Sequence, residues 1–150
     1  MFEHVGPKNY RTFMTTADSC LVDDGIFLLH TIGGLRDGVG GDPWIERYIF
    51  PNGVIPSQKQ IMDAAENIFI ARDTHEFGQY YDKTLMAWWQ NFNRSWPELK
   101  NNSKYDQRFY RIWQYYLQSC AGAFRAGKLK LWQIVFTKIK TGIINYTPIR

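Results

Sequence analysis

The sequence predicts an α/β domain in which strands and amphipathic helices alternate along the chain. Residues 25–33, GIFLLHTIG, form an apolar run between turn residues that is too short for a buried helix. Such a run predicts a strand covered on both faces, as in parallel α/β sheets, whose ligands bind beyond the carboxyl ends of the strands. The 150 residues, 45% of them hydrophobic, suffice for one packed core. His30, at the end of this strand, is therefore a candidate for chemistry.

Before this strand, Gly6 and Pro7 predict the start of a helix. Its apolar positions have helical spacing: Tyr10, Phe13, Met14, Ala17 and Leu21. After the strand, residues 33–41, GGLRDGVGG, hold five of the twelve glycines but do not match the dinucleotide-binding pattern. We predict a mobile loop over the edge of the sheet.

The middle of the chain carries two helix-start signals. Asp42 followed by Pro43 predicts the N-cap and first turn of a short helix, and residues 50–53 predict a turn. Ser57 with Gln60 forms a capping box, which predicts a second helix. A strand is expected over residues 68–76.

The C-terminal half predicts two long helices and a last strand. Residues 81–96 place large apolar side chains on one face, and Pro97 predicts the end of that helix: Leu85, Trp88, Trp89, Phe92 and Trp96. Ser103 with Asp106 is expected to cap the next helix, which Gly127 ends. Residues 129–139 are rich in β-branched and aromatic side chains and predict a strand.

The charge distribution and the cysteines give indications of the cellular location. After Asp106 there are eight basic residues and no acidic one, whereas residues 1–106 carry a net charge of −4. A basic third of this kind fits either a solvated face or contact with an anionic membrane surface. Cys20 and Cys120 lack metal-site spacing and are interpreted as small core residues in a reducing compartment. The first residues do not resemble a secretory signal, so a cytoplasmic location is expected.

Three polar residues are candidates for catalysis on local grounds: Glu3, His30 and Tyr81. Glu3 is expected in a loop that leaves a strand, and Tyr81 in the first turn of an aromatic helix. Each also has an ordinary structural explanation, as a helix-dipole partner, a hydrogen-bonded strand-end histidine or a helix anchor. His4 and His75 show no metal-ligand spacing. The helix aromatics are better explained by core packing than by stacking on bases, and we expect no nucleic-acid partner.

Several stretches in order along the chain resemble the C-terminal half of cyclopropane-fatty-acyl-phospholipid synthases, relatives of the mycolic acid cyclopropane synthases. The stretches are MFEHVGPKNYRTF, GIFLLHTIG, DPWIERYIFPNGVIPS, YYDKTLMAWWQNF and YYLQSCAGAFRAGKLKLWQIVF. They cover almost all of the 150 residues. The resemblance implies half of a Rossmann-like class I S-adenosylmethionine methyltransferase fold: three strands, with the last inserted antiparallel between two parallel ones, and flanking helices. Residues 1–150 would be the C-terminal part of the catalytic domain.

The chemistry implied by the resemblance is methylene transfer from S-adenosylmethionine to the cis double bond of a phospholipid acyl chain. Methyl transfer to an alkene carbon leaves a carbocation, and a base removes a proton from the new methyl group as the ring closes. In this family the base is a bound bicarbonate ion. The matching positions are Glu3, His30, Ile32 (through its backbone) and Tyr81.

The resemblance also implies what to expect beyond these residues. The family's glycine-rich S-adenosylmethionine site lies upstream of the MFEHVG motif, so we expect this chain to be a C-terminal fragment that is inactive alone. The strand at residues 25–32 would then lack a neighbour and pair with a second copy, giving a homodimer or strand-exchanged oligomer. The expected partner is unsaturated phospholipid at the inner face of the membrane. Two alternatives are a related lipid C-methyltransferase and a non-catalytic module that binds membranes or partners through its basic face.

Overall fold

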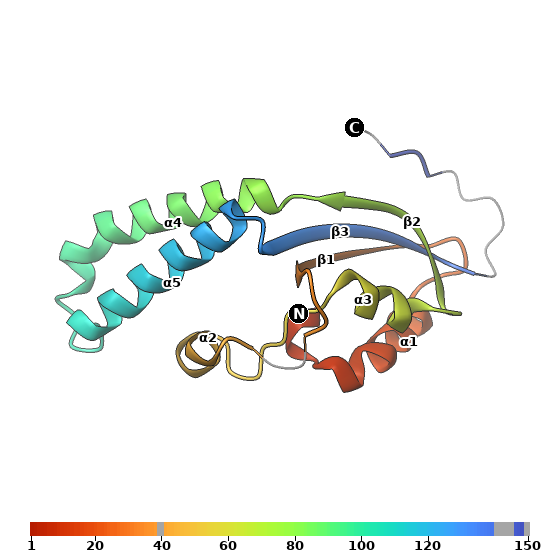
Figure 1. The fold of residues 1–150 in the computed structure, drawn as a ribbon, viewed down its shortest axis with the longest axis horizontal. Coiled ribbons are helices and arrows are strands. Elements are labelled where there is room, and N and C mark those ends of the chain that lie inside the picture. Colours follow the sequence, from red (N-terminus) through yellow and green to blue (C-terminus); the bar gives the residue numbers. More distant parts are fainter. Residues whose placement is uncertain (39–40, 140–145, 149–150) are drawn as a thin grey trace.

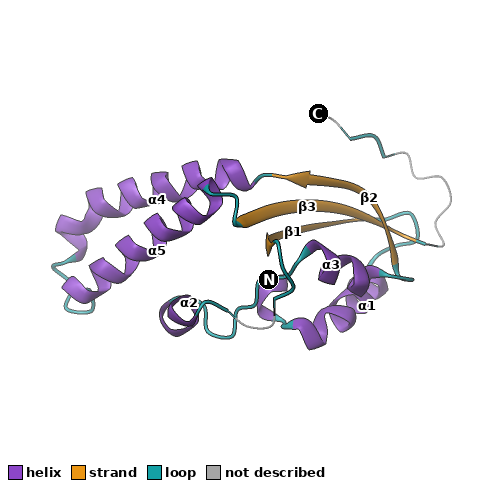
Figure 2. Ribbon diagram, viewed as in Figure 1, coloured by secondary structure: helices purple, strands orange, loops and turns teal. Residues whose placement is uncertain are grey.

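The computed structural model describes residues 1–38, 41–139 and 146–148, which form an α/β fold (Figures 1 and 2). The elements follow in this order: the 3-10 helices η1 (Phe2–His4) and η2 (Pro7–Asn9), α1 (Tyr10–Cys20), β1 (Ile26–Gly34), α2 (Pro43–Tyr48), α3 (Gln58–Ala65), β2 (Phe69–Glu76), α4 (Gly78–Leu99), α5 (Gln107–Arg125) and β3 (Leu129–Lys138). The predicted alternation of helices and strands is confirmed.

The three strands form one sheet in the order β1-β3-β2. The last strand, β3, is antiparallel to both neighbours, so β1 and β2 run in the same direction on either side of it. This is the arrangement that the family resemblance implied. The register places His30 of β1 opposite Gln133 of β3, and Ile32 opposite Leu131.

Two hydrophobic clusters hold the fold together. In the first, α1 and α3 pack against one face of the sheet, where alternate strand residues such as Leu29, Ile134 and Phe136 are buried. In the second, α4 and α5 pack against each other as a long hairpin that extends beyond the end of the sheet where β3 begins (Figure 1). Leu131 of β3 joins this second cluster.

The prediction that the first strand is covered on both faces is wrong. Leu29 and Thr31 are buried beneath the helices, but Ile26 and Leu28 point to the opposite face and are 48% and 51% exposed. The α4–α5 hairpin covers that face only at the end of the strand, where Ile32 packs against it. The rest of this face of β1 is open.

The predicted helix starts are largely confirmed, because their capping side chains are in place. Asp42 accepts hydrogen bonds from the backbone of α2, and Ser57 and Gln60 form the capping box of α3. The long helix α5 begins after Asp106, which caps it alone. The expectation that Ser103 takes part is wrong, since the Asp106 carboxylate already accepts from the N–H of Phe109. Gly127, with φ of +67°, ends α5 as predicted.

Pro97 does not end α4, contrary to the prediction. The helix runs from Gly78 to Leu99 and includes the proline in its last turn. Proline removes only its own N–H bond, and the N–H of Lys100 still bonds to the carbonyl of Trp96. Because α4 also begins three residues earlier than predicted, Tyr81 lies in its second turn.

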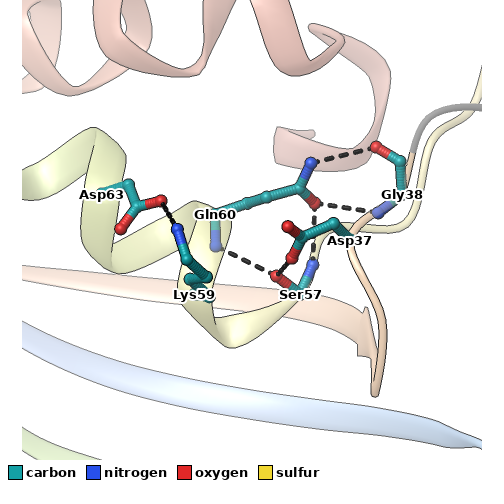
Figure 3. A network of polar contacts seen from close by, with 6 residues as sticks. All are labelled: Asp37, Gly38, Ser57, Lys59, Gln60 and Asp63. Carbon is teal, nitrogen blue, oxygen red and sulfur yellow. Dashed lines mark hydrogen bonds and ion pairs between the residues drawn. The ribbon is translucent and has the colours of Figure 1, made fainter.

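The loop after β1 is anchored to the start of α3 (Figure 3). The Gln60 side chain accepts from the N–H of Gly38 and donates to its carbonyl, while the Ser57 hydroxyl donates to Asp37. The predicted mobile loop includes residues 39 and 40, which lie outside the described residues. Residues 37 and 38 are held in place by these bonds.

Two further findings concern the setting of the protein. Cys20 is exposed at the end of α1, so its assignment to the core is wrong, and Cys120 is half-buried. Cys20 occupies a position of α1 that does not face the sheet, unlike buried Met14. Within the described ranges, none of the helices combines the length and apolar character needed to cross a membrane.

Candidate active site

A cavity of about 490 Å3 lies between the N-terminal segment, the segment that carries α2, and the α4–α5 hairpin. Most of its wall is apolar or aromatic, and a few polar groups interrupt it. The residues that matter below are Glu3, Ile32, Ile45, Tyr81, Trp88, Tyr115, Tyr116, Cys120, Ala123 and Phe124. A pocket of this size and composition suits a largely apolar small molecule.

Glu3 is one of the charged groups that line the cavity, and it lies in η1 rather than beyond a strand. Its Oε1 accepts a 2.7 Å hydrogen bond from the backbone N–H of Ile32, and its Oε2 lies 3.0 Å from the α-amino group of Met1. Burial by itself raises the pKa of this carboxyl, but hydrogen bonds from the backbone N–H groups of Glu3 and Ile32 and the nearby ammonium outweigh it. The net result is a lowered pKa, so Glu3 is ionised at neutral pH.

Tyr81 faces the same cavity from α4. Its ring packs against Phe124, with 5.0 Å between the centroids, and edge-on against Trp88. Burial and the negative charge of Glu3 raise the pKa of the phenol. Tyr81 is therefore a neutral hydroxyl that can donate a hydrogen bond into the cavity.

His30 does not line the cavity. It lies on the open face of the sheet, where Nδ1 is 3.2 Å from Nε2 of Gln133 on β3. Side chains of successive strand residues alternate between faces, so His30 and Ile32 share a face, but only Ile32 reaches the cavity. The structure thus brings together Glu3, Ile32 and Tyr81 and leaves His30 two residues away along β1.

The segment around α2 closes the cavity by packing aromatic side chains on α5. Trp44 contacts Tyr115 edge-on at 4.4 Å, and Phe50 contacts Tyr116 at 5.8 Å, between ring centroids. The Asp42 cap fixes where α2 begins, and so where Trp44 is presented. The wall therefore combines segments that are about seventy residues apart in the sequence.

Sequence reasoning missed the aromatic wall because it assigned Trp88 and Tyr116 to the core and did not single out Tyr115. Trp88 is 45% exposed and Tyr115 is 55% exposed, and both line the cavity. A signal was present at Tyr115. Trp113, Tyr116 and Cys120 have the spacing of one apolar face of a helix, and Tyr115 lies off that face.

Two further polar groups of this wall, on α5, are uncharged. Burial raises the pKa of Tyr116 to about 12 and also raises the pKa of the Cys120 thiol. Both groups are neutral at physiological pH, so the cavity combines ionised Glu3 with neutral hydroxyl and thiol groups, and Asp42 and Lys128 also line it. Among the described residues, no three His, Cys, Asp or Glu side chains are arranged to hold a metal ion.

The fold is that of the class I S-adenosylmethionine methyltransferases. Over 91% of this chain and 52% of the other, it matches the mycolic acid cyclopropane synthase CmaA1, solved with SAH and CTAB, with a TM-score of 0.81 and 29% identity. Residues 1–134 match the family model described as mycolic acid cyclopropane synthetase, and the chain belongs to this family.

Among its relatives, the cyclopropane-fatty-acyl-phospholipid synthase of Escherichia coli K12 is 53% identical over 138 residues, which make up 92% of this chain. The chain spans only 36% of that relative's length. The sphingolipid C9-methyltransferase A of Emericella nidulans is 32% identical over 92% of this chain and 28% of its own length.

Proposed function

We propose that this chain is the acyl-binding part of a cyclopropane fatty acid synthase, which transfers a methylene group from S-adenosylmethionine to the cis double bond of an unsaturated phospholipid. The observation that carries the proposal is the 53% identity to the Escherichia coli synthase, which extends over residues that form the cavity. The chain covers about a third of that relative, so the activity is assigned to a longer protein that contains these residues.

The cavity supports this proposal through its chemistry. Its apolar wall suits an acyl chain, because burying hydrocarbon is favourable and leaves no polar group unpaired. Aromatic faces of Tyr81, Trp88 and Phe124 would attract the positive charge that develops on the alkene carbon after methyl transfer.

Bicarbonate, when bound, would supply the base that accepts a proton from the new methyl group. The residues at the cavity fit it in part. Ionised Glu3 can accept the hydroxyl hydrogen of the ion, and Tyr81 can donate to one of its oxygens. The N–H of Ile32 is already bonded to Glu3, so in this structure Ile32 positions the carboxylate. His30 remains a proposed ligand on the strength of the family motif.

S-adenosylmethionine supplies the methyl group when bound, and we propose that its site is formed by residues outside this sequence. Calorimetric titration of S-adenosylmethionine into the 150-residue chain tests this. Absence of binding is the expected result. Saturable binding at micromolar concentration would contradict it and would require a new assignment of the cavity.

The proposed roles are tested in a longer protein that contains this chain, with unsaturated phospholipid vesicles and labelled S-adenosylmethionine. We expect Glu3→Gln and Tyr81→Phe each to lower kcat by roughly a hundredfold or more, the usual effect of losing a group that acts on a proton-transfer step. Tyr80→Phe is the matched control, since Tyr80 is 53% exposed and does not line the cavity. Unchanged kcat in both variants would contradict the assignment, and His30→Gln decides whether His30 contributes.

A second candidate, transfer of a methyl group without ring closure, is favoured by the 32% identity to a sphingolipid C9-methyltransferase. Product analysis by mass spectrometry separates the two. A cyclopropane ring supports the first, and a methyl-branched or unsaturated methylated chain supports the second. Either enzyme would work from the cytoplasm at the inner face of the membrane, which we propose as the location of the protein.

A further inference from the structure

Two guanidinium groups from different elements lie over the same tyrosine ring beside the cavity. Arg47 of α2 is 5.4 Å from the ring centroid of Tyr48, and Arg108 of α5 is 5.8 Å from it. Their sequence positions are about sixty residues apart, and the packing of Trp44 on Tyr115 brings the two helices together. The fold thus places two positive charges against one tyrosine ring.

Among the residues that the structure describes, no carboxylate pairs with either charge. Both arginines are exposed, and within the described part of the chain neither forms an ion pair or a hydrogen bond with a carboxylate, including that of neighbouring Glu46. Arg111, one turn further along α5, is also exposed and unpaired in the same sense. Positive charges that the protein leaves without a carboxylate partner would attract a bound anion.

The arginine pair adjoins the cavity. Ile45, on the same short helix as Arg47, lines the cavity, and so does Tyr115, which lies on α5 one turn beyond Arg111. A molecule with an apolar tail in the cavity would therefore bring a polar end to the arginines. Tyr48 and Trp44 beside them are residue types that favour the boundary between water and membrane.

We propose that Arg47 and Arg108, which both pack against the ring of Tyr48, bind the phosphate of a phospholipid headgroup whose acyl chain enters the cavity. Guanidinium groups suit phosphate because they donate paired, planar hydrogen bonds that an ammonium group cannot reproduce. This inference rests on the proposed function, because it takes the acyl chain of a phospholipid as the occupant of the cavity.

The test is cosedimentation of the 150-residue chain with mixed vesicles of phosphatidylcholine and phosphatidylglycerol, without S-adenosylmethionine. We expect Arg47→Gln/Arg108→Gln to weaken vesicle binding by roughly fivefold for each charge removed. The control Lys8→Gln/Arg36→Gln removes the same charge from exposed positions of η2 and of the loop after β1. We expect it to change binding less than twofold. Circular dichroism checks that each variant is folded.

Two further measurements separate a phosphate site from diffuse attraction and from a site for free phosphate. Arg47→Lys/Arg108→Lys keeps the charge but loses the paired donors, and we expect it to bind vesicles more weakly than wild type. Equal binding by this variant, or an equal loss in the control pair, would overturn the proposal. Saturable binding of inorganic phosphate that is lost in Arg47→Gln/Arg108→Gln, while this variant binds vesicles as wild type does, would also overturn it, in favour of a free-phosphate site. Because no measurement requires methyl transfer, failure here is distinguishable from failure of the proposed activity.

Discussion

The backbone N–H of Ile32 donates a 2.7 Å hydrogen bond to the carboxylate of Glu3, which ties the N-terminal segment to the edge of β1 inside the cavity. Glu3 also binds a third segment, because its backbone carbonyl accepts a 2.8 Å hydrogen bond from the N–H of Val54. Glu3 therefore joins three segments around the cavity and places a negative charge in it. A structural role and a proposed catalytic role coincide in one side chain.

The first prediction concerns the stability that this bond provides. Glu3→Ala leaves the N–H of Ile32 without its partner, and we expect the free energy of unfolding to fall by roughly 2 kcal/mol. Glu3→Gln keeps an acceptor oxygen and loses only the charge, so we expect the free energy of unfolding to fall by about 1 kcal/mol. This loss is the smaller one because the carboxylate is partly in contact with water, which weakens the effect of its charge. Urea denaturation measures both, with exposed Glu98→Gln as the control. Equal stability of Glu3→Ala and wild type would contradict the role of the bond.

The second prediction is the pH dependence of this contribution. The folded-state pKa of Glu3 lies below its ordinary value of 4.5, so the unfolded chain binds the proton more tightly. The stabilisation is therefore complete above the unfolded-state pKa and is lost as the pH falls through the lower folded-state pKa. We expect the difference in unfolding free energy between wild type and Glu3→Gln to shrink when the pH falls below about 4.5. A difference that widens towards low pH would show that the sign is wrong.

Local signals in the sequence predicted most of the fold, because caps and periodicity are decided by neighbouring residues. The capping box of Ser57 and Gln60 and the stop at Gly127 are examples. Exposure was harder to predict, since it depends on which elements meet. The apolar run IFLLHTI is compatible with a strand covered on one face or on both. Leu28 is exposed because α4 and α5 cover only the end of the strand near Ile32.

In the candidate site, too, some residues could be predicted from the sequence, whereas contacts between distant segments could not. Family motifs pointed to Glu3, Ile32 and Tyr81, which the fold brings to one cavity. The contact of Trp44 with Tyr115 could not be read from either segment alone, because it depends on the path of the chain between them.

The third prediction concerns the volume of the cavity. Ala123 of α5 lines the cavity, so a phenyl group at this position would occupy space proposed for the acyl chain. We expect Ala123→Phe to weaken the binding of a fluorescent long-chain fatty acid at least tenfold, as a steric block in a close-packed site would. Ala126→Phe, an exposed position at the end of the same helix, is the matched control. Equal affinity of the two variants would argue against an acyl chain in this cavity.

The fourth prediction concerns the outer edge of β1. The N–H groups of Ile32 and Gly34 point away from β3, so those of Leu28 and His30 point the same way. Within the described ranges, nothing outside the sheet bonds to the backbone of Leu28 or His30. We propose that a second copy of the chain pairs with this edge, since an unpaired apolar edge favours strand addition.

Sedimentation velocity over a range of concentrations tests the pairing. We expect the wild-type chain to associate and Leu28→Lys to remain monomeric, because a charge on the edge strand opposes pairing. Val22→Lys is the control, since Val22 is 68% exposed and precedes the strand. A strictly monomeric wild type at every concentration would refute the proposed pairing.

The fifth prediction concerns the packing that holds Ile32 in place. Gly33, the next residue of β1, lies beneath the indole of Trp132, and a Cβ at this position would be 2.0 Å from Cζ3 of that ring. Both residues are buried, so the ring cannot move aside without disturbing the core. We expect Gly33→Ala to lower the free energy of unfolding by about 3 kcal/mol, the upper part of the usual range for overpacking.

Gly122→Ala is the matched substitution, because a Cβ at that position of α5 meets no atom within 4 Å. It should instead raise stability by roughly 0.5–1 kcal/mol, through the lower helix-forming tendency of glycine. Urea denaturation separates the two signs, and a Gly33→Ala variant as stable as wild type would mean that the contact of Trp132 with β1 does not hold the strand.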